Sequence, residues 1–256
     1  MTYRLTAWRS LAFRGDPRAG EWMNGFETTR WSTVLAASGQ PSGRTREALA
    51  TLCGTYWYPL YTYLRRRGHK AEDAEDLTQG FFTSLLEKGT LRAADPERGH
   101  FRSFLLASLQ HYVSNERARA RAEKRGGSTL LLQLDDADRR YRLEPPDERT
   151  PETFFEREWA RTVLDRAGAS LREEFRRRGK EAVFDGLKEH LIGDADRLSY
   201  REIGIRLGLS EGATRVAVHR LRRRFGELLR REIGATVFHP QDIDEEIRCL
   251  IRAVAP

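Results

Sequence analysis

Apolar side chains recur three or four positions apart along the first half of the chain, as they do in helices with one buried face. The first stripe begins after Arg44, is expected to bend at Pro59 and ends at Gly68, a residue suited to a left-handed C-cap. Two further helices are expected, from Ala71 to Lys88 and from Phe101 to about Lys124. The apolar positions of the three helices are Leu49, Leu52, Tyr56, Leu60 and Tyr63, then Leu77, Phe81 and Leu85, and finally Phe101, Phe104, Leu105, Leu109 and Tyr112.

The same spacing returns after Thr150-Pro151-Glu152, where a proline in the first turn suits the start of a helix. A long helix, a shorter helix and an amphipathic segment near the C-terminus are expected. Their apolar positions are Phe155, Trp159, Val163, Leu171 and Phe175, then Val183, Phe184, Leu187 and Leu191, and last Ile243, Ile247, Leu250 and Ile251. No stretch alternates apolar and polar residues as a half-buried strand would. We therefore predict an all-α fold.

The composition along the chain predicts five segments. Residues 1–24 have no clear period and are expected to be a disordered tail, while 25–126 form a first helical domain. Residues 127–152 are rich in acids and proline and are predicted to be a flexible acidic linker. A second helical domain follows over 153–234, and 235–256 form an amphipathic extension that packs on it. A regulatory or partner-binding role for this extension stays open.

One segment of the second domain has the pattern of a helix-turn-helix motif. Ser199 and Glu202 fit a capping box that begins a short helix, and Gly208 supplies the positive φ that a tight turn needs. Leu209 is expected to fill the core under this turn, and Ser210 to cap the next helix. A short helix, a three-residue turn and a longer basic helix are typical of motifs that place the second helix in the major groove of DNA.

The second helix of this motif divides into two faces at about 100° per residue. The inward positions are expected to be Thr214, Val218, Leu221, Phe225 and Leu229. The outward positions are candidates for contact with DNA bases or phosphates, and they are Arg215, Val216, His219, Arg220, Arg222 and Arg223, with Arg224 beside them. A basic helix face is also consistent with simple solvation. The capped turn before it favours the DNA-binding interpretation.

Two motifs in one chain resemble a known family. The run Glu72-Asp-Ala-Glu-Asp-Leu-Thr-Gln-Gly-Phe-Phe and the later Phe101-Arg-Ser-Phe-Leu-Leu resemble conserved region 2 of bacterial RNA polymerase sigma factors of the extracytoplasmic-function group. The helix-turn-helix segment resembles their region 4. The resemblance covers about 44–125 and 153–233 and implies a region 2-like helical bundle joined to a region 4-like helix-turn-helix domain.

The resemblance implies a subunit that binds core RNA polymerase and directs promoter recognition, promoter melting and transcription initiation. Region 2 would dock on the clamp helices of the largest polymerase subunit through Asp73, Asp76 and Gln79, and region 4 would lie at the flap and bind the −35 promoter element. A helix start matched to the helix dipole would explain the same acids without any partner. The family also implies an anti-sigma factor as a possible partner.

The helix after Phe101 resembles the part that reads and opens the −10 promoter element. Single-strand binding needs positive charge and planar groups on which bases stack. The candidates are His111, Tyr112, Asn115, Arg117, Arg119, Arg121 and Lys124. Phe104 and His111 depart from the family, which commonly has Trp and Asn there. The linker acids Asp135, Asp136 and Asp138 would mimic nucleic acid in the polymerase cleft, although a solvated linker explains them equally well.

The overall charge and composition argue against several other classes of protein. Forty-five basic and thirty-eight acidic residues give a net charge of +7, which favours a polyanionic partner. Charged residues make up 32% of the chain and no apolar run suits a membrane span, so we expect a cytoplasmic protein with no membrane contact. The two cysteines and six histidines lack metal-ligand spacing, and there is no phosphate-binding glycine loop. We therefore expect no metal, no cofactor and no catalysis.

A different class of protein fits part of the same pattern. A stand-alone helix-turn-helix regulator would use the N-terminal block as a dimerisation or sensor domain. Such a dimer would bind palindromic half-sites about one helical turn apart. Co-purification with core polymerase separates the two hypotheses.

Overall fold

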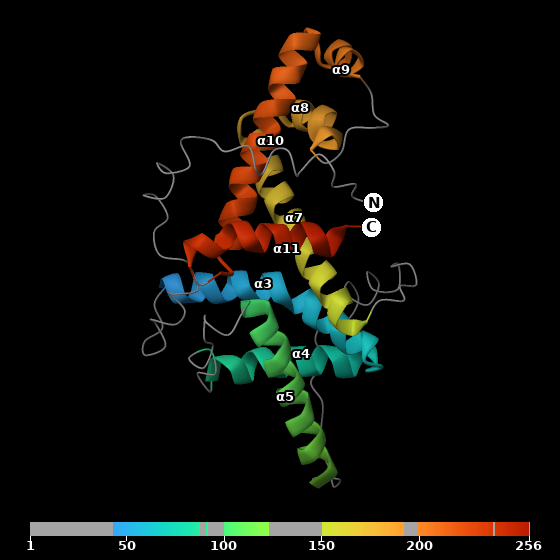
Figure 1. Ribbon diagram of the computed structural model, residues 1–256, viewed down its shortest axis with the longest axis vertical. Coiled ribbons are helices and arrows are strands. Elements are labelled where there is room, and N and C mark those ends of the chain that lie inside the picture. The colour runs from blue at the N-terminus through green and yellow to red at the C-terminus, as the bar shows by residue number, and fades with distance from the viewer. Residues whose placement is uncertain are drawn as a thin grey trace. The chain divides into compact units, whose positions relative to one another are not determined.

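The computed structural model describes residues 43–87, 91, 100–122, 150–191, 199–237 and 239–255. Within these ranges every regular element is a helix and there is no strand, which confirms the predicted all-α class (Figure 1). None of the described helices is long and apolar enough to cross a bilayer. The elements in chain order are α3 (Gly43–Arg66), α4 (Ala71–Glu87), α5 (Phe101–Ala122), α7 (Pro151–Arg177), α8 (Glu181–Leu187), η4 (Lys188–His190), α9 (Tyr200–Leu207), α10 (Glu211–Gly234), η5 (Pro240–Asp242) and α11 (Ile243–Val254).

The described helices belong to two compact units. The first unit consists mainly of α3, α4, α5 and the start of α7 up to Trp159. The second unit begins at Ala160 within α7 and contains α8, α9, α10 and α11. The predicted tail over 1–24 and nearly all of the predicted linker, including Asp135, Asp136 and Asp138, lie outside the described residues.

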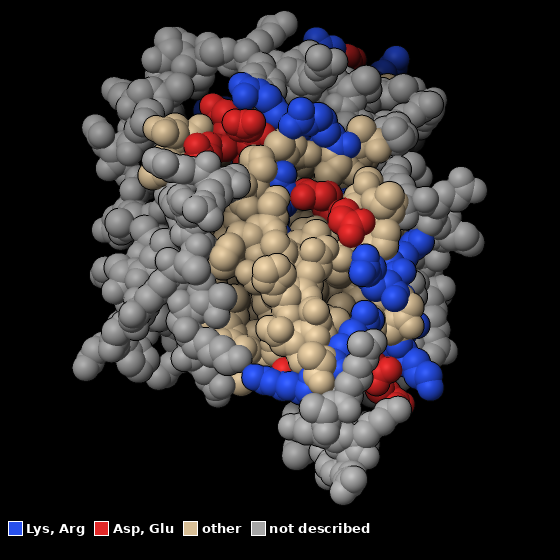
Figure 2. Space-filling model, turned by 60° about the horizontal axis from the view of Figure 1, so that its bottom comes forward, with Lys and Arg blue, Asp and Glu red and all other residues tan. Residues whose placement is uncertain are grey.

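The core of the first unit is aromatic. Tyr56 and Leu60 of α3 and Leu109 of α5 are fully buried, and the ring of Tyr56 meets Phe101 edge-on at 5.6 Å between centroids. α3 is one continuous helix through Pro59, where the proline has no backbone N–H to donate. Figure 2 turns the end that carries α4 and α5 toward the viewer and shows both basic and acidic side chains around a broad uncharged area.

The first turns of α7 pack in the first unit, although the sequence analysis placed residues from 153 onward in the second domain. The guanidinium of Arg66 lies 4.1 Å from the ring centroid of Phe154. Arg102, almost fully buried, forms an ion pair with Glu156 and lies 4.6 Å from the ring centroid of Trp159. These contacts join positions far apart in the sequence, so helix periodicity alone carries no sign of them.

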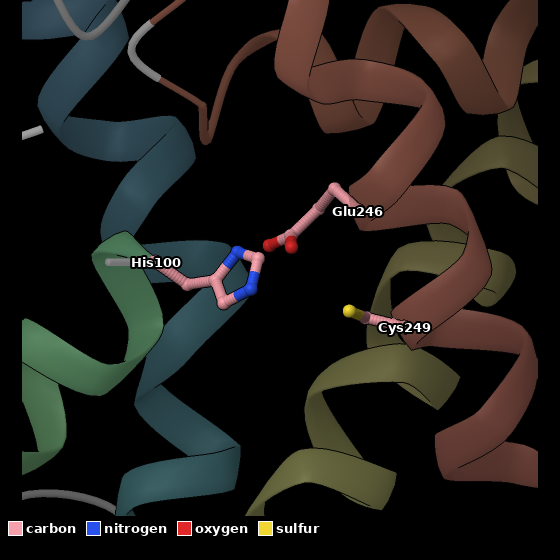
Figure 3. Close-up of side chains that lie close together, drawn as sticks. All are labelled: His100, Glu246 and Cys249. Atoms are coloured by element: carbon pink, nitrogen blue, oxygen red, sulfur yellow. The ribbon is translucent and has the colours of Figure 1, made fainter. Parts of the chain in front are cut away.

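The second unit is built around α10. Arg224 donates two hydrogen bonds to the Glu174 carboxylate of α7, which fixes the two helices together. α11 packs on α10 with Ile243, Ile247 and Leu250 buried, as predicted for an amphipathic helix. Val254 is also buried, whereas Ile251, the fourth predicted position, is only half-buried. Glu246 and Cys249 project from one side of this helix (Figure 3), and the Cys249 sulfur lies 3.0 Å from Arg252 Nη2.

Candidate nucleic-acid interface

The short helix α9 begins with the predicted capping box. The Oγ of Ser199 accepts a hydrogen bond from the backbone N–H of Glu202 at 3.3 Å, and the Glu202 carboxylate accepts the Ser199 N–H at 2.6 Å. This backbone hydrogen bond holds the pKa of Glu202 below its usual value of 4.5. The sequence prediction for the start of α9 is confirmed.

The turn after α9 rests directly on the helix. Gly208 has φ +66°, and the N–H of Leu209 donates to the carbonyl of Gly204 at 2.8 Å. Ser210 Oγ accepts the N–H of Ala213 at 3.2 Å, so the predicted cap of α10 is confirmed. A Cβ atom on Gly204 would lie 2.6 Å from the Leu209 carbonyl oxygen and 2.9 Å from Thr214 Oγ1. Gly204 therefore lets the two helices approach, a role that an isolated glycine within a helical pattern can signal.

Leu209 does not fill the core as predicted. The residue is 37% exposed, and its backbone makes the contact with α9. Leu207 packs inward instead, 3.0 Å from where a Cβ on Gly186 of α8 would lie. Ile205 and Val216 are the other large apolar side chains that are exposed among the described residues.

The two faces of α10 match the sequence prediction. All five predicted inward positions are buried: Thr214, Val218, Leu221, Phe225 and Leu229. Five of the six predicted DNA-contact residues share the outward face and line one open hollow on it: Arg215, Val216, His219, Arg220 and Arg223. Arg222 is not among them, because its Nε donates to the carbonyl oxygen of His190 at 2.7 Å.

The arginines of α10 differ in how far acids neutralise them. Arg215 pairs with Glu211 at 3.1 Å and Arg223 lies 3.7 Å from Glu227, both on the exposed surface where such pairs are weak. Arg224 pairs with Glu174 of α7 and with Glu227 of α10, so its guanidinium is already engaged. A phosphate contact from Arg224 stays a prediction. Within the described part of the chain, Arg220 and His219 have no ion pair or hydrogen bond. Among the described residues, their donors are therefore left for an external acceptor.

Acid is expected to weaken the attachment of α10 to α7. The Arg224 hydrogen bonds lower the pKa of Glu174 from its usual value of 4.5. A carboxyl whose pKa is lower in the folded state than in the unfolded state stabilises the fold at pH values above its unfolded-state pKa. This stabilisation is lost as the pH falls through its folded-state pKa. The free energy of unfolding should therefore fall more steeply below pH 4.5 in the wild type than in Glu174→Gln, as measured by urea unfolding along a pH series. Glu189→Gln, an exposed carboxyl, is the control and should follow the wild type. Parallel curves for all three proteins would contradict the pairing.

The predicted polymerase contacts lie together on α4. Asp73, Asp76 and Gln79 are exposed. Phe81 and Leu85, on another side of the same helix, are buried. Gln79 Nε2 donates to the carboxylate of Glu75 at 3.0 Å, so part of the Gln79 amide is already occupied. Burial raises the pKa of Glu75, with a further increase from the charge of Asp76. Sequence analysis counted Glu75 among the acids of a helix start matched to the dipole, but not among the polymerase contacts.

The residues predicted to open the −10 element lie on different sides of α5. His111 and Asn115 are exposed, one turn apart on the outward side. Tyr112 turns toward α4 instead, where its ring lies 5.9 Å from that of Phe81 and its hydroxyl occupies the space that a side chain at Gly80 would need. The structure therefore does not bring Tyr112 together with the exposed pair.

The basic members of this set are also separated. Arg119 pairs with Glu116 at 2.9 Å on the surface. Arg117 points toward the turn after α3, where its Nη2 lies 2.9 Å from His69 Nε2. The side chains of Arg121 and Lys124 lie outside the described residues.

No protein-family model and no solved structure matches the chain.

Proposed function

We propose that this chain is a sigma factor of the extracytoplasmic-function type. It binds core RNA polymerase through α4, recognises the −35 element with α10 and opens the −10 element with α5. It carries out no catalysis of its own. An anti-sigma factor is a further possible partner.

The outward face of α10 is the observation that carries this proposal. A major groove admits one helix and is read by donors and small apolar groups on that helix. Arg220 and His219 offer donors that have no partner among the described residues, and Val216 offers an exposed methyl surface suited to a thymine methyl group. The capped helix α9 and the left-handed Gly208 hold this face outward.

The first unit supports a polymerase-bound regulator over a dimeric repressor. Its motif resembles sigma region 2, and the acids that would contact the polymerase are exposed on one helix. Run-off transcription with core polymerase on selected promoter fragments tests the proposal. Transcripts that start at defined sites only when the protein is added would support it. Tight binding to palindromic duplexes as a dimer, without any effect on the polymerase, would support the stand-alone regulator instead.

The Asp76→Ala variant is expected to weaken binding to core polymerase and leave duplex binding by α10 unchanged. Asp76 is exposed and no acid–base pair holds it within the described residues, so its loss should not disturb the fold. Affinity for core polymerase is measured by pull-down and duplex affinity by fluorescence anisotropy. Thr83→Ala, an exposed change on the same helix, is the control. Equal polymerase affinity in Asp76→Ala and the control would remove Asp76 from the interface.

A further inference from the structure

The turn between α3 and α4 lies beside the last turns of α5 and gathers positive charge. Arg67 and Lys70 are exposed in this turn, and Arg117 of α5 joins them through its contact with His69. Within the described residues, none of these three cations forms an ion pair with an acid. Elsewhere on the described surface many arginines are paired, as Arg119 is with Glu116. We call Arg67, Lys70 and Arg117 the turn cluster.

The sequence builds this cluster through its backbone. Gly68 has φ +85° and closes α3, with its N–H donating to the Arg65 carbonyl and the N–H of His69 donating to the Leu64 carbonyl. The reversal brings the His69 ring to the Arg117 guanidinium at 2.9 Å. An arginine has only donors, so His69 Nε2 must be the unprotonated acceptor. Burial, followed by the charge of Arg117, lowers the pKa of His69, which agrees with this acceptor role.

Helix dipoles explain only part of this charge. Cations after the last turn of α3 are favourable, because the carbonyl end of a helix carries partial negative charge. Lys70 stands directly before α4, where the partial charge is positive and a cation is disfavoured. The negative charge of Asp73 raises the pKa of His69 and so opposes the effects of burial and Arg117, but Asp73 forms no ion pair with the turn cluster. An external anion would relieve the remaining repulsion.

The surface next to the cluster indicates which anion fits. The outward side of α5 between Ser103 and Asn115 has exposed residues without charge, among them His111. A surface that offers cations to phosphates and planar or hydrogen-bonding groups to bases suits an unpaired strand. We propose that Arg67, Lys70 and Arg117 bind the phosphates of a single nucleic-acid strand, with His69 holding Arg117 in position. This inference deepens the proposed function, since it assigns to strand binding a turn that the promoter-opening set did not include.

The salt dependence of strand binding tests the inference. The full-length protein is titrated into a fluorescein-labelled oligo-dT strand and anisotropy is followed at increasing NaCl. Each lost phosphate contact lowers the slope of log affinity against log salt by about 0.7 for a single strand. Arg67→Ala combined with Lys70→Ala should therefore lower the slope by about 1.4, so that the loss of affinity between 50 and 200 mM salt becomes about sevenfold smaller than in the wild type.

A matched control removes the same charge elsewhere. Arg176→Ala combined with Lys188→Ala also deletes two cations, but both are paired with acids on the second unit, Glu173 and Asp185. This control should keep the wild-type slope. Equal slopes for the cluster variant and the control would overturn the inference. That result would not contradict the proposed function, which run-off transcription tests. Absence of run-off transcripts, together with the expected salt slopes, would overturn the proposed function alone.

Variants of His69 test its positioning role. His69→Gln keeps an acceptor for Arg117, and His69→Leu removes it. We expect the glutamine variant to retain the wild-type salt slope and the leucine variant to lose about 0.7 of it, because Arg117 then leaves the cluster. Wild-type slopes in both variants would show that His69 does not position Arg117.

Discussion

Gly204→Ala is expected to lower the free energy of unfolding of the second unit by about 2–3 kcal/mol. The new methyl group would lie 2.6 Å from the Leu209 carbonyl oxygen and 2.9 Å from Thr214 Oγ1. Neither atom can yield easily, because the first belongs to the backbone of the turn and the second donates to the Ser210 carbonyl at 3.0 Å. This collision outweighs the gain of about 1 kcal/mol that alanine normally brings to a helix.

A second glycine provides the control for this prediction. Gly226 lies in α10 with no atom within 4 Å of the position where its Cβ would be. Gly226→Ala should therefore raise the free energy of unfolding by about 0.5–1 kcal/mol through helix propensity alone. Urea unfolding followed by circular dichroism measures both variants. If Gly204→Ala were as stable as Gly226→Ala, α9 and the turn would not be as close as described.

Features that depend on neighbours in the sequence could be predicted. The capping box of Ser199 and Glu202 joins residues three positions apart, and the left-handed turn at Gly208 follows from the one residue that tolerates it. The inward face of α10 repeats with the period of the helix itself, so it was also predictable. Local chemistry therefore determines much of the motif that carries the proposed function.

Features that depend on another element could not be predicted in the same way. Arg222 and Arg224 flank Arg223 in the same basic run, yet they have partners on η4 and α7. Tyr112 turns toward α4 because Gly80 leaves space for its ring. A helical wheel assigns these residues to a polar or an apolar side, but it contains no information about the neighbouring helix. The candidate site is therefore smaller and more divided than the sequence alone indicated.

In this smaller candidate site, we expect Arg220 to contribute most to DNA recognition. Among the arginines in the α10 hollow, Arg215 and Arg223 share their charge with acids of the same helix, whereas Arg220 is unpaired within the described residues. A guanidinium that reaches a guanine edge contributes about 1–3 kcal/mol of discrimination against other bases. Arg220→Ala should therefore weaken binding to the upstream promoter duplex by roughly 5- to 150-fold and reduce transcription from it.

The comparison with a neighbouring charge makes this prediction specific. Arg231→Ala removes an exposed arginine from α10 outside the hollow, so it lowers the net charge equally and tests non-specific attraction. Fluorescence anisotropy with the selected duplex and with base-substituted duplexes measures both variants. Arg220→Ala should lose its preference for one base pair, because a base contact is missing, while Arg231→Ala should keep the full preference. If the two variants lost affinity equally on every duplex, α10 would be bound through its charge alone and would not read the sequence of the promoter.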